Sequence, residues 1–181
     1  GIYRFAPHDA DRLAALYEDQ LDRVEVTKFV PASGAATRMF AIPSGFLGGR
    51  FQIESAIFSG ECPPEPGPAS FLCHFFSGLR QGRFAFTDEL DAALRRQGST
   101  LRRALKKGEH KRILSTLLEP EHLGYADLPK ALIPFHHVGG RDYTPLEEHL
   151  AEAAAYGRGR GDVCRVHFTV PLEHQEAISV R

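Results

Sequence analysis

The chain has 181 residues, enough to bury one hydrophobic core, and its 43% hydrophobic and 25% charged residues are typical of a globular protein. Its 22 Lys and Arg residues nearly balance 23 Asp and Glu residues, which argues against a nucleic-acid partner. No apolar run approaches the ~18 residues of a membrane span, and the N-terminus lacks a secretory signal pattern. We therefore expect no membrane partner and a cytoplasmic location.

The first two thirds of the sequence predict a helix, a strand, a long loop and a helical region. Apolar residues at helical spacing predict an amphipathic helix over residues 9–23, with Asp9 as its N-cap. Residues 26–30 are β-rich and predict a buried strand that leads into a loop. Residues 41–68 are rich in Gly and Pro and end in a stiff Pro-Pro-Glu-Pro-Gly-Pro stretch. Residues 69–119 contain several short amphipathic segments and predict a helical insertion.

The last third alternates strand and helix patterns. A short apolar run at residues 131–135 predicts a strand or an extended segment. Thr144 and Glu147 form a capping box, which predicts a helix that ends near Gly157. Residues 162–170 are β-rich, and another helix is expected to follow them.

This order of elements is typical of an α/β protein whose parallel sheet is covered by helices. We expect the strand at residues 26–31 to be central, and parallel to strands near residues 132–136 and 163–170. Parallel strands covered on both faces are apolar, so their side chains should be largely buried. The side chains expected to be buried are Val26, Phe29, Val30 and Val166.

The chain contains three cysteines, Cys62, Cys73 and Cys164. Their number is odd and none forms a C-x-x-C pair, which predicts reduced, packed thiols in a reducing compartment. A zinc site built on Cys73 and His74 is the alternative, but the sequence offers no matching pair of ligands.

Residues 31–39 follow the first predicted strand and contain small residues that let the backbone approach an anion. The N–H groups of such a turn bind phosphate, and Arg38 adds positive charge. The segment is neither a Walker loop nor a G-x-G-x-x-G fingerprint, and Ser33 lacks the flanking glycines of a nucleophile elbow. The alternative is a tight strand-to-helix turn without a ligand.

A second segment places Lys130 between Pro129 and Pro134 in an otherwise apolar context. A lysine in this position suits a point charge against a phosphate. The alternative is an exposed lysine at the mouth of a strand.

Together, residues 32–39 and 129–134 resemble two motifs of the sugar-nucleotide pyrophosphorylase and nucleotidyltransferase superfamily. The Gly-Gly-x-Gly-Thr-Arg loop is matched with Ser33 and Ala36 at two glycine positions, and the Pro-Lys-x-Leu-x-Pro segment is matched in full. In typical members the two motifs lie close in sequence, whereas here the helical stretch separates them. More closely, PASGAATRMF, FAFTDEL, LPKALIPFH, TPLEEHL and HFTVPLEH look like the bacterial family known as domain of unknown function 4301, whose members are longer.

The resemblance implies a nucleotidyltransferase-like (GT-A or Rossmann-like) core with residues 69–119 as a helical insertion or cap. Residues 1–181 would form a single domain, the N-terminal part of a longer protein. As catalytic residues, Arg38 would contact the β and γ phosphates, and Lys130 would neutralise charge near the α-phosphate. Mg²⁺ held by carboxylates would complete the site, with ligands that the sequence before Arg181 does not identify. The residues expected to hold the nucleotide are Ala32, Ser33, Gly34, Ala35, Ala36, Thr37 and Arg38.

The nine histidines include no His-x-x-x-His or HEXXH pair on a predicted helix, so each is by default a hydrogen-bonded or surface residue. His136 and His167 are the candidate substrate contacts, because they lie near predicted strand ends, where α/β proteins bind ligands.

We therefore expect a protein that binds a nucleotide or sugar-phosphate, and transfer of a nucleotidyl group to a phosphorylated metabolite if it is an enzyme. One alternative is a non-catalytic phosphate-binding module. A further alternative is a helical interaction domain built on residues 69–119. The sequence leaves the nucleobase, the acceptor and the oligomeric state open.

Overall fold

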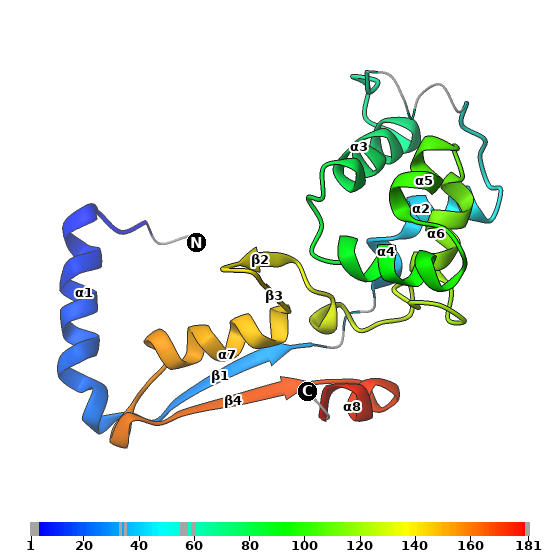
Figure 1. Cartoon of the computed structure of the whole chain (residues 1–181). Coiled ribbons are helices and arrows are strands. Elements are labelled where there is room, and N and C mark those ends of the chain that lie inside the picture. Colours follow the sequence, from blue (N-terminus) through cyan, green and yellow to red (C-terminus); the bar gives the residue numbers. More distant parts are fainter. Residues whose placement is uncertain (1–3, 33, 35, 55–57, 59–60, 180–181) are drawn as a thin grey trace.

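In the computed structural model, residues 4–32, 34, 36–54, 58 and 61–179 are described. The protein is a mixed α/β structure with a helical body and an elongated arm (Figure 1). The helical body contains α2 (Ala41–Leu47), α3 (Pro68–Arg80), α4 (Thr87–Arg96), α5 (Leu101–Lys106) and α6 (His110–Leu118). The arm contains α1 (Pro7–Gln20), β1 (Val26–Pro31), α7 (Pro145–Tyr156) and β4 (Cys164–Thr169). The remaining elements are η1 (Leu21–Arg23), η2 (Ala36–Arg38), η4 (Lys130–Leu132), β2 (His136–Val138), β3 (Arg141–Tyr143), η5 (Arg160–Asp162) and α8 (Leu172–Ser179).

The helical body is built around an aromatic and aliphatic core. Phe76 is fully buried, and its ring meets that of Phe58 edge to face with the centroids 5.1 Å apart. Ala36 and Phe40, which follow β1, belong to the same buried cluster as the helices of residues 69–119. The predicted helical region therefore packs directly beside the loop that follows the first strand.

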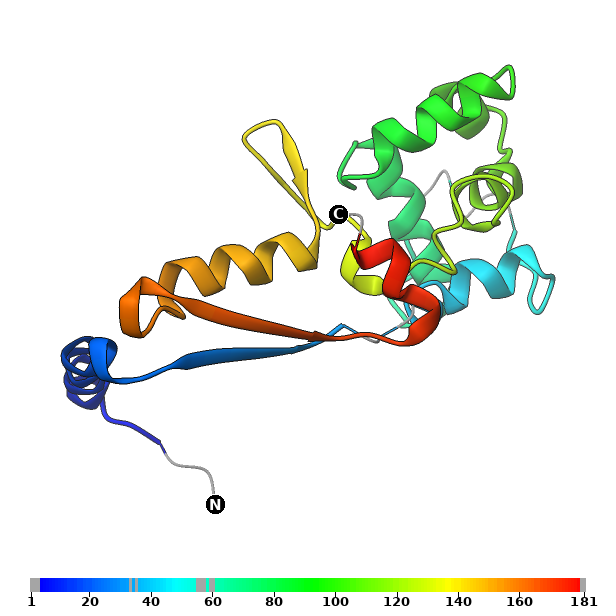
Figure 2. The same cartoon turned by 90° about the horizontal axis from the view of Figure 1, so that it is seen from below.

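The arm is organised around two parallel strands, β1 and β4, paired in register from Val26 with Cys164 to Pro31 with Thr169. Figures 1 and 2 show these strands extending away from the helical body, with α1 at their far end. Helix α7 covers one face of the pair, so Val30 is buried, whereas the opposite face leaves Phe29 69% exposed. The predicted parallel pairing of these two strands is confirmed.

The expected burial of the sheet is correct only in part. Val30 is buried and Val26 and Val166 are half-buried, but Phe29 points to the uncovered face, where its ring stacks on His167 at 5.1 Å. Successive side chains of a strand point to opposite faces, so covering by α7 alone buries only every second residue. The apolar run in β1 was interpreted as burial on both faces, and for Phe29 this is wrong.

The strand expected near residues 132–136 does not form. Residues 130–132 make the 3-10 turn η4, and β2 pairs antiparallel with β3 in a separate hairpin. Pro134 has no N–H to donate to a sheet, and Gly139 and Gly140 both adopt positive φ, of 60° and 81°, at the hairpin turn. The described parallel sheet therefore has two strands, not three.

Two helix N-caps were predicted, and one is correct. At α7, the Thr144 side chain accepts from the Glu147 N–H, and the Glu147 carboxylate accepts from the Thr144 N–H at 2.9 Å, as a capping box requires. At α1 the N-cap is Ala6, and Asp9 is the third helical residue, whose carboxylate accepts the Ala6 N–H at 3.1 Å. Pro7 begins the helix earlier than expected because proline suits the first helical position.

The prediction of three reduced cysteines is wrong. Cys62 and Cys73 form a disulfide, with Cα atoms 5.5 Å apart, and Cys164 is the free thiol. The bond ties the segment before α3 to the middle of that helix. It also removes Cys73 from the alternative zinc site with His74.

Candidate functional site

A pocket of about 240 Å³ lies where β1 ends. The parallel ladder continues one residue past the strand, because the Ala32 N–H donates to the Thr169 carbonyl at 3.0 Å. Beyond this point the chain turns away and leaves a hollow between the loop, η4 and α7. The pocket is lined by Ala32 and Gly34 from the loop, Lys130 from η4, and Leu146 and His149 from α7.

The loop after β1 and the segment that carries Lys130 are joined by backbone hydrogen bonds. The Lys130 N–H donates to the Gly34 carbonyl at 2.9 Å, and the Ala36 N–H donates to the Leu128 carbonyl at 3.3 Å. Two segments about a hundred residues apart therefore form one wall, as a shared site requires. The side chain of Lys130 is exposed at the mouth of this pocket.

The predicted phosphate loop is only partly available to a ligand. Ala32 and Ala36 are buried, and both of their N–H groups are bonded within the protein. Gly34 is exposed, and a Cβ built on it would meet no atom within 4 Å, so a ligand can approach its backbone closely. Ser33 and Ala35 lie outside the described residues.

The last two residues of the predicted loop, Thr37 and Arg38, are exposed in η2. Neither lines the pocket that contains Lys130. The structure thus brings Lys130 to the backbone at Gly34 but places the Arg38 side chain outside the hollow that they enclose.

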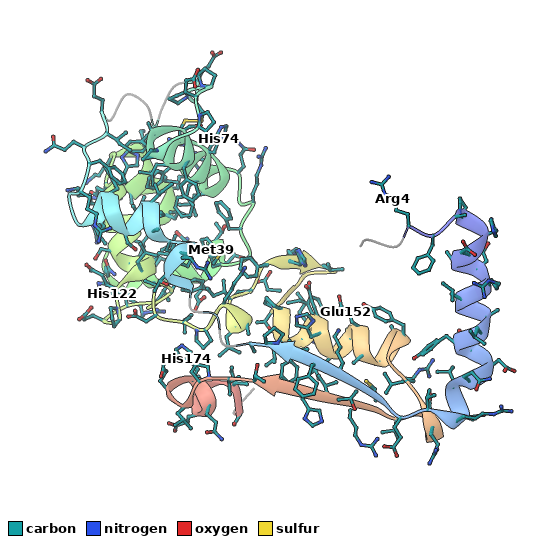
Figure 3. The ribbon with its side chains drawn as sticks, turned by 180° about the vertical axis from the view of Figure 1, so that it is seen from behind. Arg4, Met39, His74, His122, Glu152 and His174 are labelled. Atoms are coloured by element: carbon teal, nitrogen blue, oxygen red, sulfur yellow. A yellow bond between two sulfur atoms is a disulfide. The ribbon has the colours of Figure 1, made fainter. Side chains whose placement is uncertain are left out.

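His149 is a polar residue of the pocket that was not predicted from the sequence. Its Nδ1 atom lies 3.3 Å from a carboxylate oxygen of Glu152. Figure 3 labels Glu152 on the same helix, α7. Lys28 reaches across from β1 and bonds both the Glu152 carboxylate and the His149 carbonyl, the latter at 3.2 Å. The hydrogen bond from Lys28, and secondly that from His149, lower the pKa of Glu152 below its usual value. Glu152 is therefore an anionic partner for Nδ1 of His149.

A signal for His149 existed in the sequence. The Thr144 capping box fixes where α7 begins, and so places Leu146 and His149 on one helical face, three residues apart. Glu152 follows at the same spacing and can orient the imidazole.

The two histidines predicted as substrate contacts lie elsewhere. His136 is exposed on the β2–β3 hairpin and contacts the Glu148 carboxylate. His167 is exposed on the uncovered face of β4, stacked on Phe29. Neither lines the pocket beside Lys130.

The residues that line this pocket include no carboxylate for a magnesium ion. Mg²⁺ needs carboxylate oxygens, and within the described part of the chain no three His, Cys, Asp or Glu side chains gather as a metal site. Glu152 of α7, which contacts His149, is bonded to Lys28. We therefore derive no chemical step through a metal.

A comparison with protein families shows which family the chain belongs to. One family model matches residues 1–181. The chain belongs to the DUF4301 family, a domain of unknown function. The DUF4301 assignment therefore identifies relatives without supplying a reaction. No curated protein and no solved structure is significantly similar to the chain. Within the described residues, no helix of this DUF4301 chain is long and apolar enough to cross a membrane.

Proposed function

We propose that the protein binds a phosphorylated small molecule, a nucleotide or a sugar-phosphate, in the pocket at the end of β1. The observation that carries this proposal is the position of Lys130, whose N–H is bonded to the Gly34 carbonyl and which lines the same pocket as His149. An ammonium group and an imidazole beside an open glycine backbone can neutralise and hydrogen-bond a phosphate. Ligands of α/β proteins bind at the carboxyl ends of parallel strands, where this pocket lies.

The finer proposal is nucleotidyl transfer, by resemblance to the pyrophosphorylase superfamily. Lys130 would then neutralise the charge that develops on the transferred phosphate, an electrostatic role that needs no covalent chemistry from the protein. The non-catalytic alternative uses the same groups for binding alone. Mg²⁺ belongs only to the catalytic version.

The test is calorimetric titration of the protein with nucleoside triphosphates and with hexose 1-phosphates. Lys130→Ala should weaken binding by about tenfold or more, equivalent to ~1.5–3 kcal/mol for a charge-assisted hydrogen bond. Lys107→Ala is the matched control, because it removes the same charge from the helical body outside the pocket. Equal losses for both variants, or no binding of any phosphorylated ligand, would refute the pocket as the site.

Arg38→Ala measures how far the site extends. If a bound phosphate follows the whole loop, Arg38→Ala should weaken binding as Lys130→Ala does. If the ligand stays within the pocket, Arg38→Ala should leave affinity unchanged. If the protein is an enzyme, Lys130→Ala should also reduce the turnover rate, by a larger factor than the loss of affinity explains.

A further inference from the structure

A second hollow lies on the helical body, away from the candidate site. It has a volume of about 530 Å³ and is lined by Leu79 and Arg80 at the end of α3 and by Arg102, Leu105 and Lys106 of α5. Helices α3 and α5 are in contact, so their side chains share one surface. The hollow has no lining residue in common with the pocket beside Lys130.

The three cations that line this hollow have no counter-charge among the described residues. Arg80, Arg102 and Lys106 are exposed, and within the described residues none forms a salt bridge or a side-chain hydrogen bond. Two acids of residues 80–112 pair with other cations: Asp91 with Arg95 at 2.7 Å, and Glu109 with Arg112 at 3.2 Å. Like charges that converge without a counter-charge repel one another until an anion binds.

The surrounding segment increases this positive potential. Residues 80–112 hold ten of the 22 Lys and Arg residues but only four of the 23 Asp and Glu residues, in a chain whose net charge is −1. The positive charge also affects a buried side chain of the core. Burial lowers the pKa of His110, and the positive charge of Arg80 lowers it further. The near-neutral net charge of the whole chain thus conceals a strongly basic region.

We propose that the hollow formed by Arg80, Arg102 and Lys106 binds a compact polyanion, a small molecule that carries several phosphate groups. Guanidinium groups bind phosphate oxygens in pairs, and an ammonium adds a point charge. The volume of the hollow falls in the usual range for small-molecule pockets, about 300–1,000 Å³. Leu79 and Leu105 supply the apolar part of the lining. The three cations converge on one hollow instead of following a line, which favours a compact anion over an extended nucleic-acid backbone.

Inorganic tripolyphosphate is the probe, because it carries the phosphate charge without a base or sugar. Isothermal titration of the whole chain should detect binding that weakens as salt is added. Arg102→Ala and Lys106→Ala should each reduce affinity by about tenfold. The matched controls are Arg103→Ala and Lys107→Ala, which remove the same charge from the adjacent positions but do not line the hollow. They should change affinity by less than about threefold, the scale of a long-range charge effect.

Three outcomes would overturn the proposal. If tripolyphosphate does not bind, the hollow is not an anion site. If all four variants lose affinity equally, binding depends on the general positive potential and not on the residues that line the hollow. A single-stranded oligonucleotide that binds more tightly than tripolyphosphate, and loses affinity in the control variants too, would assign the surface to nucleic acid. Lys130→Ala should leave tripolyphosphate binding in this hollow unchanged. The test of this hollow is therefore independent of the function proposed for the pocket beside Lys130.

Discussion

The helical body and the arm contain similar apolar side chains but bury them very differently. In the body, Phe76 and Leu114 have no exposed surface, and the helices around them enclose a continuous core. In the arm, α1 has no buried residue, and the outer face of the sheet leaves Phe29 exposed. Parallel strands are usually covered on both faces, and here α7 covers only one.

The arm is therefore held more by hydrogen bonds and polar contacts than by a core. The strands pair along their length, Lys28 joins β1 to Glu152 of α7, and the Tyr17 hydroxyl donates to the Arg158 carbonyl at 2.8 Å. Exposed polar contacts of this kind contribute little net stability, whereas burial of apolar area dominates folding. The body therefore supplies most of the stability, while the candidate site lies where the arm meets the body.

The largest expected effect is the difference in stability loss when a phenylalanine is truncated in the body and when one is truncated in the arm. Phe76→Ala creates a cavity in the core and should lower the free energy of unfolding by about 3–5 kcal/mol. Phe29→Ala removes an exposed ring and should cost less than about 1 kcal/mol. Urea unfolding followed by circular dichroism measures both. A Phe29→Ala loss as large as that of Phe76→Ala would mean that the outer face of the sheet is covered in solution.

The disulfide also distinguishes the two regions, because it lies in the body. Opening the Cys62–Cys73 bond should reduce stability by about 2–3 kcal/mol, since the reduced unfolded chain regains the freedom of a closed loop. Thermal unfolding with and without a reductant detects this change. The Cys62→Ala/Cys73→Ala double variant is the control and should not respond to reductant. If wild type and double variant respond alike, the bond does not form in solution.

The same contrast explains which parts of the fold were predictable. Helices in the body carry regular apolar spacing, so residues 69–119 were correctly predicted as helical, and the α7 start was set by local capping chemistry. The strand near residues 132–136 was wrong because an apolar run alone does not distinguish a strand from a turn that packs on the core. The hairpin that forms instead has a Gly139-Gly140 turn, a pattern that was legible in the sequence.

The disulfide could not be read from three cysteines, since their pairing depends on how α3 packs against the preceding segment. For the candidate site, the sequence predicted that the Lys130 segment and the post-strand loop belong together, and their backbones are bonded. It did not predict that Ala32 and Ala36 would use their N–H groups within the protein. Such internal bonding follows from tertiary contacts that no local motif encodes. His149 was passed over because an isolated helical histidine is by default a surface residue.

The smallest effect concerns pH, and it too should come from the body. His110 at the start of α6 is only 6% exposed and lies against the rings of Phe58 and Phe76, with centroids 4.0 and 4.6 Å away. Its Nε2 atom has no hydrogen-bond partner among the described residues. A charged imidazole there would lose its hydration without compensation, so burial, and secondly the positive charge of Arg80, lower the pKa of His110.

This lowered pKa sets the sign of the pH dependence. Just below the ordinary histidine pKa of about 6.5, His110 is protonated in the unfolded chain but stays neutral in the folded protein. Stability is therefore full above that pH and falls as the pH drops, by at most about 1.4 kcal/mol per pH unit, until the folded pKa is reached. Urea unfolding of wild type and His110→Leu across this range isolates the contribution, since the leucine cannot titrate. His167→Leu is the matched variant in the arm, because it makes the same substitution at an exposed histidine. A wild-type slope that persists in His110→Leu but disappears in His167→Leu would reverse the comparison and place the pH-sensitive group in the arm.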